Sequence, residues 1–149
     1  MTAEALWNDF CRENPACAGE DYEAWAFGGD PDGLLALVLA GTKTATSSAY
    51  DAYGPDEPLP RVGDYSVILD SREAARCILR TTRVYLCPYE QVPAEHAWKE
   101  GEGDRSLAHW RGVHEPFFTG ELAAVGLPFA EDRLVVCEEF RVVYREETA

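Results

Sequence analysis

Lysine is rare in this chain, and one of the two lysines lies in a run of hydroxyl residues. Against eleven arginines there are only Lys43 and Lys99, and Lys43 falls within GTKTATSS, residues 41–48. A lysine can hold an anionic group or, when desolvated, act as a base for a neighbouring hydroxyl. A solvated lysine just after a helix is also favourable, because the helix C-terminus is electronegative. The run therefore predicts either a functional lysine or an ordinary helix end.

The spacing within this run constrains the geometry. In a regular strand starting at Lys43, the side chains of Lys43 and Thr46 would point to opposite faces. A bulge or a helical turn after Gly41 is needed to bring them to one pocket. We expect such a lysine to lie at the pocket rim, where its substitution would change stability little.

A second group of candidate residues occupies HAWKEGEGDRSLAHWRGVHEPFF, residues 96–118. Glu100, Glu102 and Asp104 alternate with glycines, which would let carboxylates approach a ligand or a metal ion, as an ordinary acidic loop also would. His96 and Glu100 are four apart and share one helical face. The zinc-site spacings are absent, so we predict no metal ion and no cofactor, and leave open a divalent ion through Glu102 and Asp104.

The same segment contains a mixed helical stripe. Leu107, Trp110, Arg111 and His114 follow the i, i+3, i+4, i+7 pattern of one helix face. Arg111 and His114 beside two apolar residues indicate that the end of this face borders a cleft. Trp110 would then stack a base, with Arg111 holding a phosphate or carbonyl. The alternative is a tryptophan at the edge of the core beside a paired arginine.

Periodicity and caps outline the elements that must position these residues. Apolar stripes and end signals predict helices, and alternating runs predict strands. In the last strand Glu138 interrupts the apolar face. These elements predict one α+β domain, residues 1–149, with a small, mostly antiparallel β-barrel and flanking helices. The expected helices are 3–13, 30–41, one from 93 and one from 104, with a short helical turn at 21–28; the expected strands are 43–48, 64–70, 76–89 and 132–146.

Composition narrows the possible partners and the compartment. The formal net charge of −14 disfavours tight binding to duplex DNA, which needs many cationic contacts to phosphates. Five cysteines without a C-x-x-C motif predict free thiols in a reducing compartment. No apolar run reaches the roughly 20 residues that span a bilayer. We therefore expect a cytoplasmic protein without membrane contact.

Four blocks in this order resemble an ASCH-domain protein of the PUA-like superfamily: GTKTAT, PRVGDYSVILD, residues 96–118, and LVVCEEFRVVYRE. The resemblance extends from about Trp7 to Tyr144, and is to the longer bacterial-type group. It implies a small β-barrel with flanking helices, and a cleft that faces RNA or nucleosides. Ribonuclease activity and RNA binding have been suggested for the longer group.

Short members of the family are amidohydrolases that remove the acyl group of N4-acetylcytidine with a lysine, a threonine and a glutamate. By motif these correspond here to Lys43, Thr46 and Glu100, or to Glu102 in place of Glu100. The short members carry an arginine soon after the threonine, where this chain has Ser47 and Ser48.

The resemblance and the residues together predict a protein that binds a nucleoside or short single-stranded RNA. We expect a hydrolase acting on an N4-acylcytidine-type amide, with a ribonuclease and a non-catalytic RNA-binding module as alternatives. The oligomeric state is left open. The predicted catalytic residues are Lys43, Thr46, Glu100 and Glu102, and the predicted ligand-binding residues are Ser47, Ser48, Trp110, Arg111 and His114.

Overall fold

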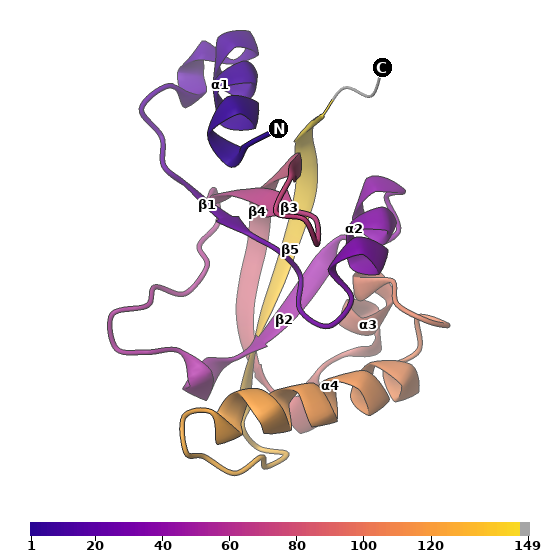
Figure 1. The fold of residues 1–149 in the computed structure, drawn as a ribbon. Coiled ribbons are helices and arrows are strands. Elements are labelled where there is room, and N and C mark those ends of the chain that lie inside the picture. The colour runs from indigo at the N-terminus through magenta and orange to yellow at the C-terminus, as the bar shows by residue number, and fades with distance from the viewer. Residues whose placement is uncertain (147–149) are drawn as a thin grey trace.

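Within residues 1–146, five strands form one mixed sheet around which four helices are arranged (Figure 1). The computed structural model describes residues 1–146. The strand order is β1-β3-β4-β5-β2; β1 runs parallel to β3, and the other three pairings are antiparallel. The helices are α1 (Ala3–Glu13), α2 (Pro31–Leu39), α3 (Ala94–Glu100) and α4 (Leu107–Ala123), and the strands are β1 (Tyr22–Trp25), β2 (Ala45–Ala49), β3 (Tyr65–Leu69), β4 (Ala75–Pro88) and β5 (Leu134–Arg145).

The α+β class and the flanking helices are confirmed, but the predicted closed barrel is wrong. The sheet's edge strands are β1 and β2, and within residues 1–146 these two edges do not pair. A barrel would need them to hydrogen-bond to each other. Residues of both edge strands instead line one large cleft, so the sheet stays open around it.

The long antiparallel pair of β4 and β5 is the spine of the molecule (Figure 1). Between these strands the chain leaves the sheet to form α3 and α4. The two ends of this excursion are held together, because the amides of Tyr89 and Glu90 donate to the carbonyls of Arg133 and Glu131 at 2.9 Å each. The excursion therefore begins and ends at one place.

Local signals explain most element boundaries. Asp30 caps α2 by accepting from the Gly33 amide at 3.0 Å, and Pro31 occupies the first turn. The cap of α4 is Ser106, whose hydroxyl accepts from the His109 amide, so the helix begins later than the expected start at residue 104. The segment expected as a helical turn is β1, so that prediction is wrong: its pairing with β3 decides the conformation.

Three apolar clusters hold the helices on the sheet. One packs α1 on β3 and β4, a second packs α2 on the sheet centre, and the third lies between α3, α4 and β5. The cysteines are free thiols, as predicted, and Cys17, Cys77 and Cys137 are buried. None of the helices in the described part of the chain is both long and apolar enough to cross a bilayer.

Candidate functional site

The turn after α2 places Lys43 and Thr46 in the same cleft. Gly41 has a φ of +81°, a conformation that favours glycine, and the amides of Thr42 and Lys43 both donate to the carbonyl of Leu37. Strand β2 begins only at Ala45. Because Lys43 precedes the strand, the alternation of strand side chains does not apply to it, and both residues line the cleft.

Lys43 is buried, which differs from the expected rim position. Only 2% of the residue is exposed. Its Nζ lies 3.3 Å from Glu100 Oε1 and 3.1 Å from Glu102 Oε2, and 5.5 Å from the centroid of the Phe27 ring. A buried ammonium is costly unless it is paired, so the two carboxylates are part of its folded environment. Tolerance of Lys43 substitutions by the fold is therefore not expected.

Glu100 is the centre of the buried polar network. Its carboxylate accepts hydrogen bonds from the Ser47 hydroxyl at 2.5 Å and from the Trp110 indole N–H. His96 Nε2 lies 3.0 Å from Oε2, and His114 Nε2 lies 3.5 Å from Oε1. Burial alone would disfavour the ionised form, but His114, His96 and Lys43 outweigh it, and the pKa of Glu100 lies well below its ordinary value. Glu100 is thus a permanent carboxylate.

The two histidines beside Glu100 have different surroundings. His96 Nε2 also lies 2.7 Å from the Ser47 hydroxyl, whereas its buried Nδ1 has no hydrogen-bond partner among residues 1–146. His114 Nδ1 lies 2.9 Å from the carbonyl of Trp110 and must carry a hydrogen to bond there. Burial opposes a charge on His114, but the hydrogen bond and charge of Glu100 raise its pKa. His114 also belongs to the lining of the cleft, with its two ring nitrogens facing the Trp110 carbonyl and Glu100.

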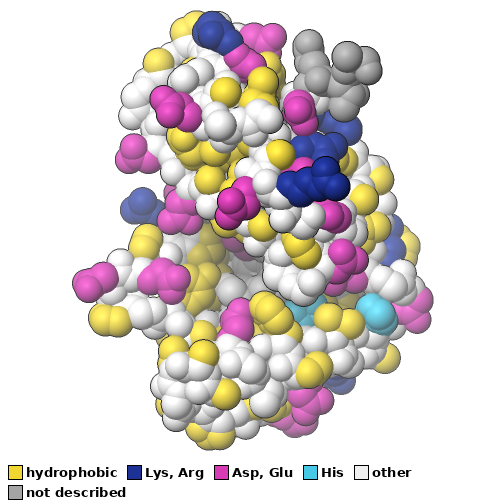
Figure 2. Space-filling model, viewed as in Figure 1, with side chains coloured by type: hydrophobic (Ala, Val, Ile, Leu, Met, Phe, Trp, Pro, Cys, Tyr) yellow, Lys and Arg dark blue, Asp and Glu magenta, His cyan; other side chains and the backbone are white. Residues whose placement is uncertain are grey.

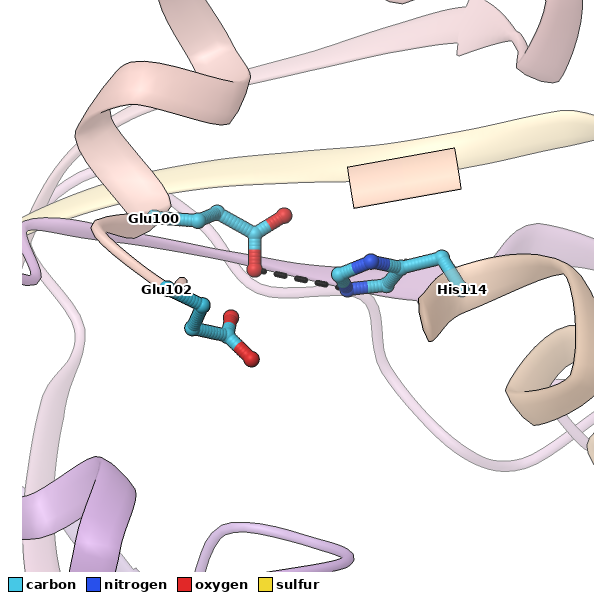
Figure 3. Close-up of side chains that lie close together, drawn as sticks. All are labelled: Glu100, Glu102 and His114. Carbon is cyan, nitrogen blue, oxygen red and sulfur yellow. Dashed lines mark ion pairs between the residues drawn. The ribbon is translucent and has the colours of Figure 1, made fainter. Parts of the chain in front are cut away.

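Glu102 follows α3 and approaches the same centre from the loop (Figure 3). Ligand atoms of Glu100, Glu102 and His114 lie within 4.8 Å of one another, as a metal site would require. However, the ammonium of Lys43 already contacts both carboxylates. Any ion bound to these ligands would share both carboxylates with the Lys43 ammonium. Asp104, the other candidate, accepts from the Ser106 amide in the turn before α4 and is no part of this centre.

The cleft beside this network has a volume of about 1070 Å³ and opens to the surface. Figure 2 shows the hollow between the α4 part of the molecule and the upper part, with acidic side chains around it. The Thr46 hydroxyl lines the cleft and has no protein hydrogen-bond partner among the described residues. The Ser48 hydroxyl, also in the lining, lies 2.7 Å from that of Tyr53. Thr46 is therefore free to meet a ligand.

Trp110 and Arg111 do not occupy the ligand-facing positions that the helical stripe suggested. Trp110 is 3% exposed and stacks on His114 with ring centroids 4.4 Å apart. Its indole N–H is used by Glu100, so its role is to support the carboxylate. Arg111 is exposed, donates to the carbonyl of Glu90, and does not line the cleft. The alternative of a tryptophan at the core edge describes Trp110 better.

Sequence reasoning did not assign three residues that the structure places at the site. His96 contacts Glu100 and Ser47, and its i, i+4 spacing from Glu100 was the signal. Glu138 lines the cleft and accepts from the Thr81 hydroxyl at 2.7 Å; the signal was its interruption of an apolar strand face. Phe27 lies under Lys43 and had no local signal.

Comparisons with known proteins agree with this architecture. Residues 23–144 match the family model of the ASCH domain. The ASCH domain of Lactobacillus crispatus JV V101 shares 32% sequence identity over 95% of this chain and 94% of that one, with a TM-score of 0.89. Protein EF3133 of Enterococcus faecalis V583 shares 35% identity over 99% and 96% of the two chains, with a TM-score of 0.86.

More distant likeness is limited to the fold. The hypothetical protein PH0355 is 14% identical, with a TM-score of 0.56 over 82% of this chain and 98% of that one. No curated protein matches the chain.

Proposed function

The chain belongs to the ASCH-domain family, a PUA-like fold family proposed as RNA-binding, and from this premise we propose that it is a hydrolase of a modified nucleoside. The substrate class is an N4-acylcytidine-type amide. One observation carries the proposal: one large cleft is lined by a buried lysine, which is paired with two glutamates, and by a threonine hydroxyl without a hydrogen-bond partner among the described residues. Lysine, threonine and glutamate are the residues that the resemblance to the short amidohydrolases requires.

In this proposal Lys43 acts as a cation rather than as a base. Its Nζ is held by Glu100 and Glu102 and is placed to stabilise negative charge on the acyl oxygen as the tetrahedral intermediate forms. Glu100 fixes the ammonium position and is itself fixed by its other partners.

Thr46 supplies or orients the nucleophile, and Glu102 transfers the proton. The Thr46 hydroxyl either attacks the acyl carbon or orients the attacking water. Glu102, which is more exposed than Glu100, takes the nucleophile's proton and delivers it to the N4 amine as the C–N bond breaks. The products are a carboxylic acid and cytidine, with one water consumed in all.

The test is an assay of the purified protein with N4-acetylcytidine, following release of cytidine. We expect turnover by the wild type and a loss of about 100-fold or more in Thr46→Val and in Glu102→Gln. Thr44→Val is the matched control, because Thr44 lies in the same segment but does not line this cleft. Absence of turnover by the well-folded wild type, or equal activity in Thr46→Val, would contradict the proposal. A labelled single-stranded RNA in the same assay would expose a ribonuclease instead.

A further inference from the structure

The net charge of the residues that line the cleft affects which ligands can bind there. Nine acidic residues belong to its lining, against Lys43, Arg61 and His114 as the cationic or protonatable ones. Lys43 is already compensated in place, because it contacts two of those nine carboxylates. A ligand that reaches the site thus meets a surplus of negative charge. Clefts of one charge sign repel ligands of the same sign.

Two further groups of acids belong to the lining besides the two that contact Lys43. Burial, and after it the charges of Asp64 and Glu23, raise the pKa of Glu138 on β5. Burial, and after it the charge of Glu57 in the 53–64 loop, likewise raise the pKa of Glu121 on α4. Carboxylates therefore border the cleft from the sheet and also from α4 and the loop opposite.

Apolar side chains provide the remaining surface. Phe27 is buried beneath Lys43, whereas Val113 and Phe117 of α4 line the cleft with 39% and 38% of their surface exposed. Such a wall suits a planar base or an acyl group. Carboxylates suit ribose hydroxyls and the N–H groups of a base, which donate hydrogen bonds. Dianionic phosphate only accepts, so it has no donor to offer them.

We infer that the cleft selects free nucleosides or nucleobases and disfavours nucleotides and RNA chains. This inference rests on the proposed function and names its substrate class: uncharged ligands of nucleoside size with several hydrogen-bond donors. It assigns discrimination to the carboxylates around the mouth, whereas the chemistry belongs to Lys43, Thr46 and Glu102.

The test compares binding of cytidine, cytidine 5′-monophosphate and a short oligocytidylate by isothermal titration calorimetry. Several like charges within a Debye length of the phosphate are expected to weaken the monophosphate about tenfold relative to cytidine. The oligocytidylate is expected to bind more weakly still. Raising the salt concentration should narrow the gap between cytidine and the monophosphate.

A charge-matched pair of variants locates the effect. Glu57→Gln with Glu121→Gln removes two acids of the cleft, and Glu4→Gln with Glu131→Gln removes two acids that do not line it. The first pair should raise the affinity ratio of monophosphate to cytidine by about threefold, and the second should leave the ratio unchanged. An equal effect of both pairs would overturn the inference.

Failure here is distinguishable from failure of the proposed hydrolysis. If N4-acetylcytidine and its 5′-monophosphate were turned over with equal kcat/KM, the proposed hydrolase activity would stand and the inferred preference for nucleosides over nucleotides would be wrong. If cytidine bound more tightly than the monophosphate but N4-acetylcytidine were not turned over, the inferred preference for nucleosides would stand and the proposed hydrolase activity would be wrong. No binding of any of the three probes, with N4-acetylcytidine not turned over, would contradict both.

Discussion

At the scale of single residues, the chain's two lysines offer a matched comparison. Lys43 is buried between Glu100 and Glu102, whereas Lys99 is partly exposed and contacts Glu95 at 2.8 Å and Glu139 at 3.2 Å. Removing one partner of a buried pair leaves an uncompensated charge, at a cost of about 3 kcal/mol. Exposed pairs contribute less than about 1 kcal/mol.

We therefore expect Lys43→Ala to lower the free energy of unfolding by about 3 kcal/mol and Lys99→Ala to lower it by less than about 1 kcal/mol. Urea unfolding followed by circular dichroism measures both. Adding Glu100→Gln to Lys43→Ala should recover part of the loss, because the double variant no longer buries an unpaired carboxylate. Equal effects of the two lysine variants would contradict the buried ion pair.

His114 predicts a pH dependence of stability with a definite sign. Its pKa is raised above the ordinary 6.5: burial opposes this rise, but the bond to Glu100 outweighs the burial. A group whose pKa is higher in the folded state binds its proton more tightly there. Its stabilising contribution is thus complete below pH 6.5 and disappears as the pH rises through the raised value.

The stability difference between wild type and His114→Gln should therefore be largest in mildly acidic buffer and should shrink towards alkaline pH. Chemical unfolding across this range measures it. Repeating the series in a Glu100→Gln background is the control, because the partner that raises the pKa is then neutral. If the stability difference instead grew as the pH rose, protonation of His114 would not stabilise the folded state, and the prediction would be wrong.

At the scale of elements, the end of α3 is fitted against the turn that carries Lys43. Gly101 follows α3 with a φ of +73°, and a Cβ there would lie 2.5 Å from the Thr42 carbonyl oxygen. Gly126 has a similar φ of +79°, but a Cβ there would have no neighbour within 4 Å. The two glycines thus share the same backbone strain and differ only in the contact.

Gly126→Ala is expected to cost about 1 kcal/mol of stability, the cost of an alanine in the left-handed region. Gly101→Ala should cost at least about 2 kcal/mol, since it adds a clash with backbone that cannot rotate away. It should also reduce whatever activity Lys43 supports, because the turn must shift. Thermal unfolding and the nucleoside assay check both expectations. Similar losses in the two variants would show that the contact with Thr42 is unimportant.

An element could be predicted from the sequence when residues within it determine its conformation, and not when distant residues do. Helices α1 and α2 carry their own caps and apolar stripes, and their predicted bounds agree with the structure within two residues. Strand β1 carries no such signal: its four residues are extended because Tyr22–Trp25 pair with β3 more than forty residues later. Closure of the sheet likewise depends on distant edges, which no local pattern encodes.

The same distinction applies to the site. The Lys43 turn and the Glu100 and Glu102 loop were marked by residue type and by resemblance to a family motif. The role of Trp110 could not be predicted in this way. Trp110 donates a hydrogen bond to Glu100, and this role exists because a buried carboxylate requires hydrogen-bond donors. A stripe on a helix shows which face is buried, but not which buried polar group that face must satisfy.

At the scale of the whole molecule, the thiols predict indifference to redox conditions. All five cysteines are free, and burial raises the pKa of Cys77 and of Cys137 to about 12, so neither is a reactive thiolate at neutral pH. The melting temperature should be the same with and without a reducing agent, as differential scanning calorimetry can measure. A fall of several degrees on adding reductant would reveal a structural disulfide.

The excursion between β4 and β5 has a consequence for how the molecule can change. Its two ends lie side by side, joined at Tyr89–Arg133 and Glu90–Glu131, while the segment between them supplies Glu100, Glu102 and His114. Besides these two anchor points and an apolar contact surface, the excursion is joined to the Lys43 turn and to β2 by buried polar contacts. An excursion exchanged between relatives would therefore need a matching Lys43 turn and a matching Ser47 on β2, so the two parts of the site are expected to change together.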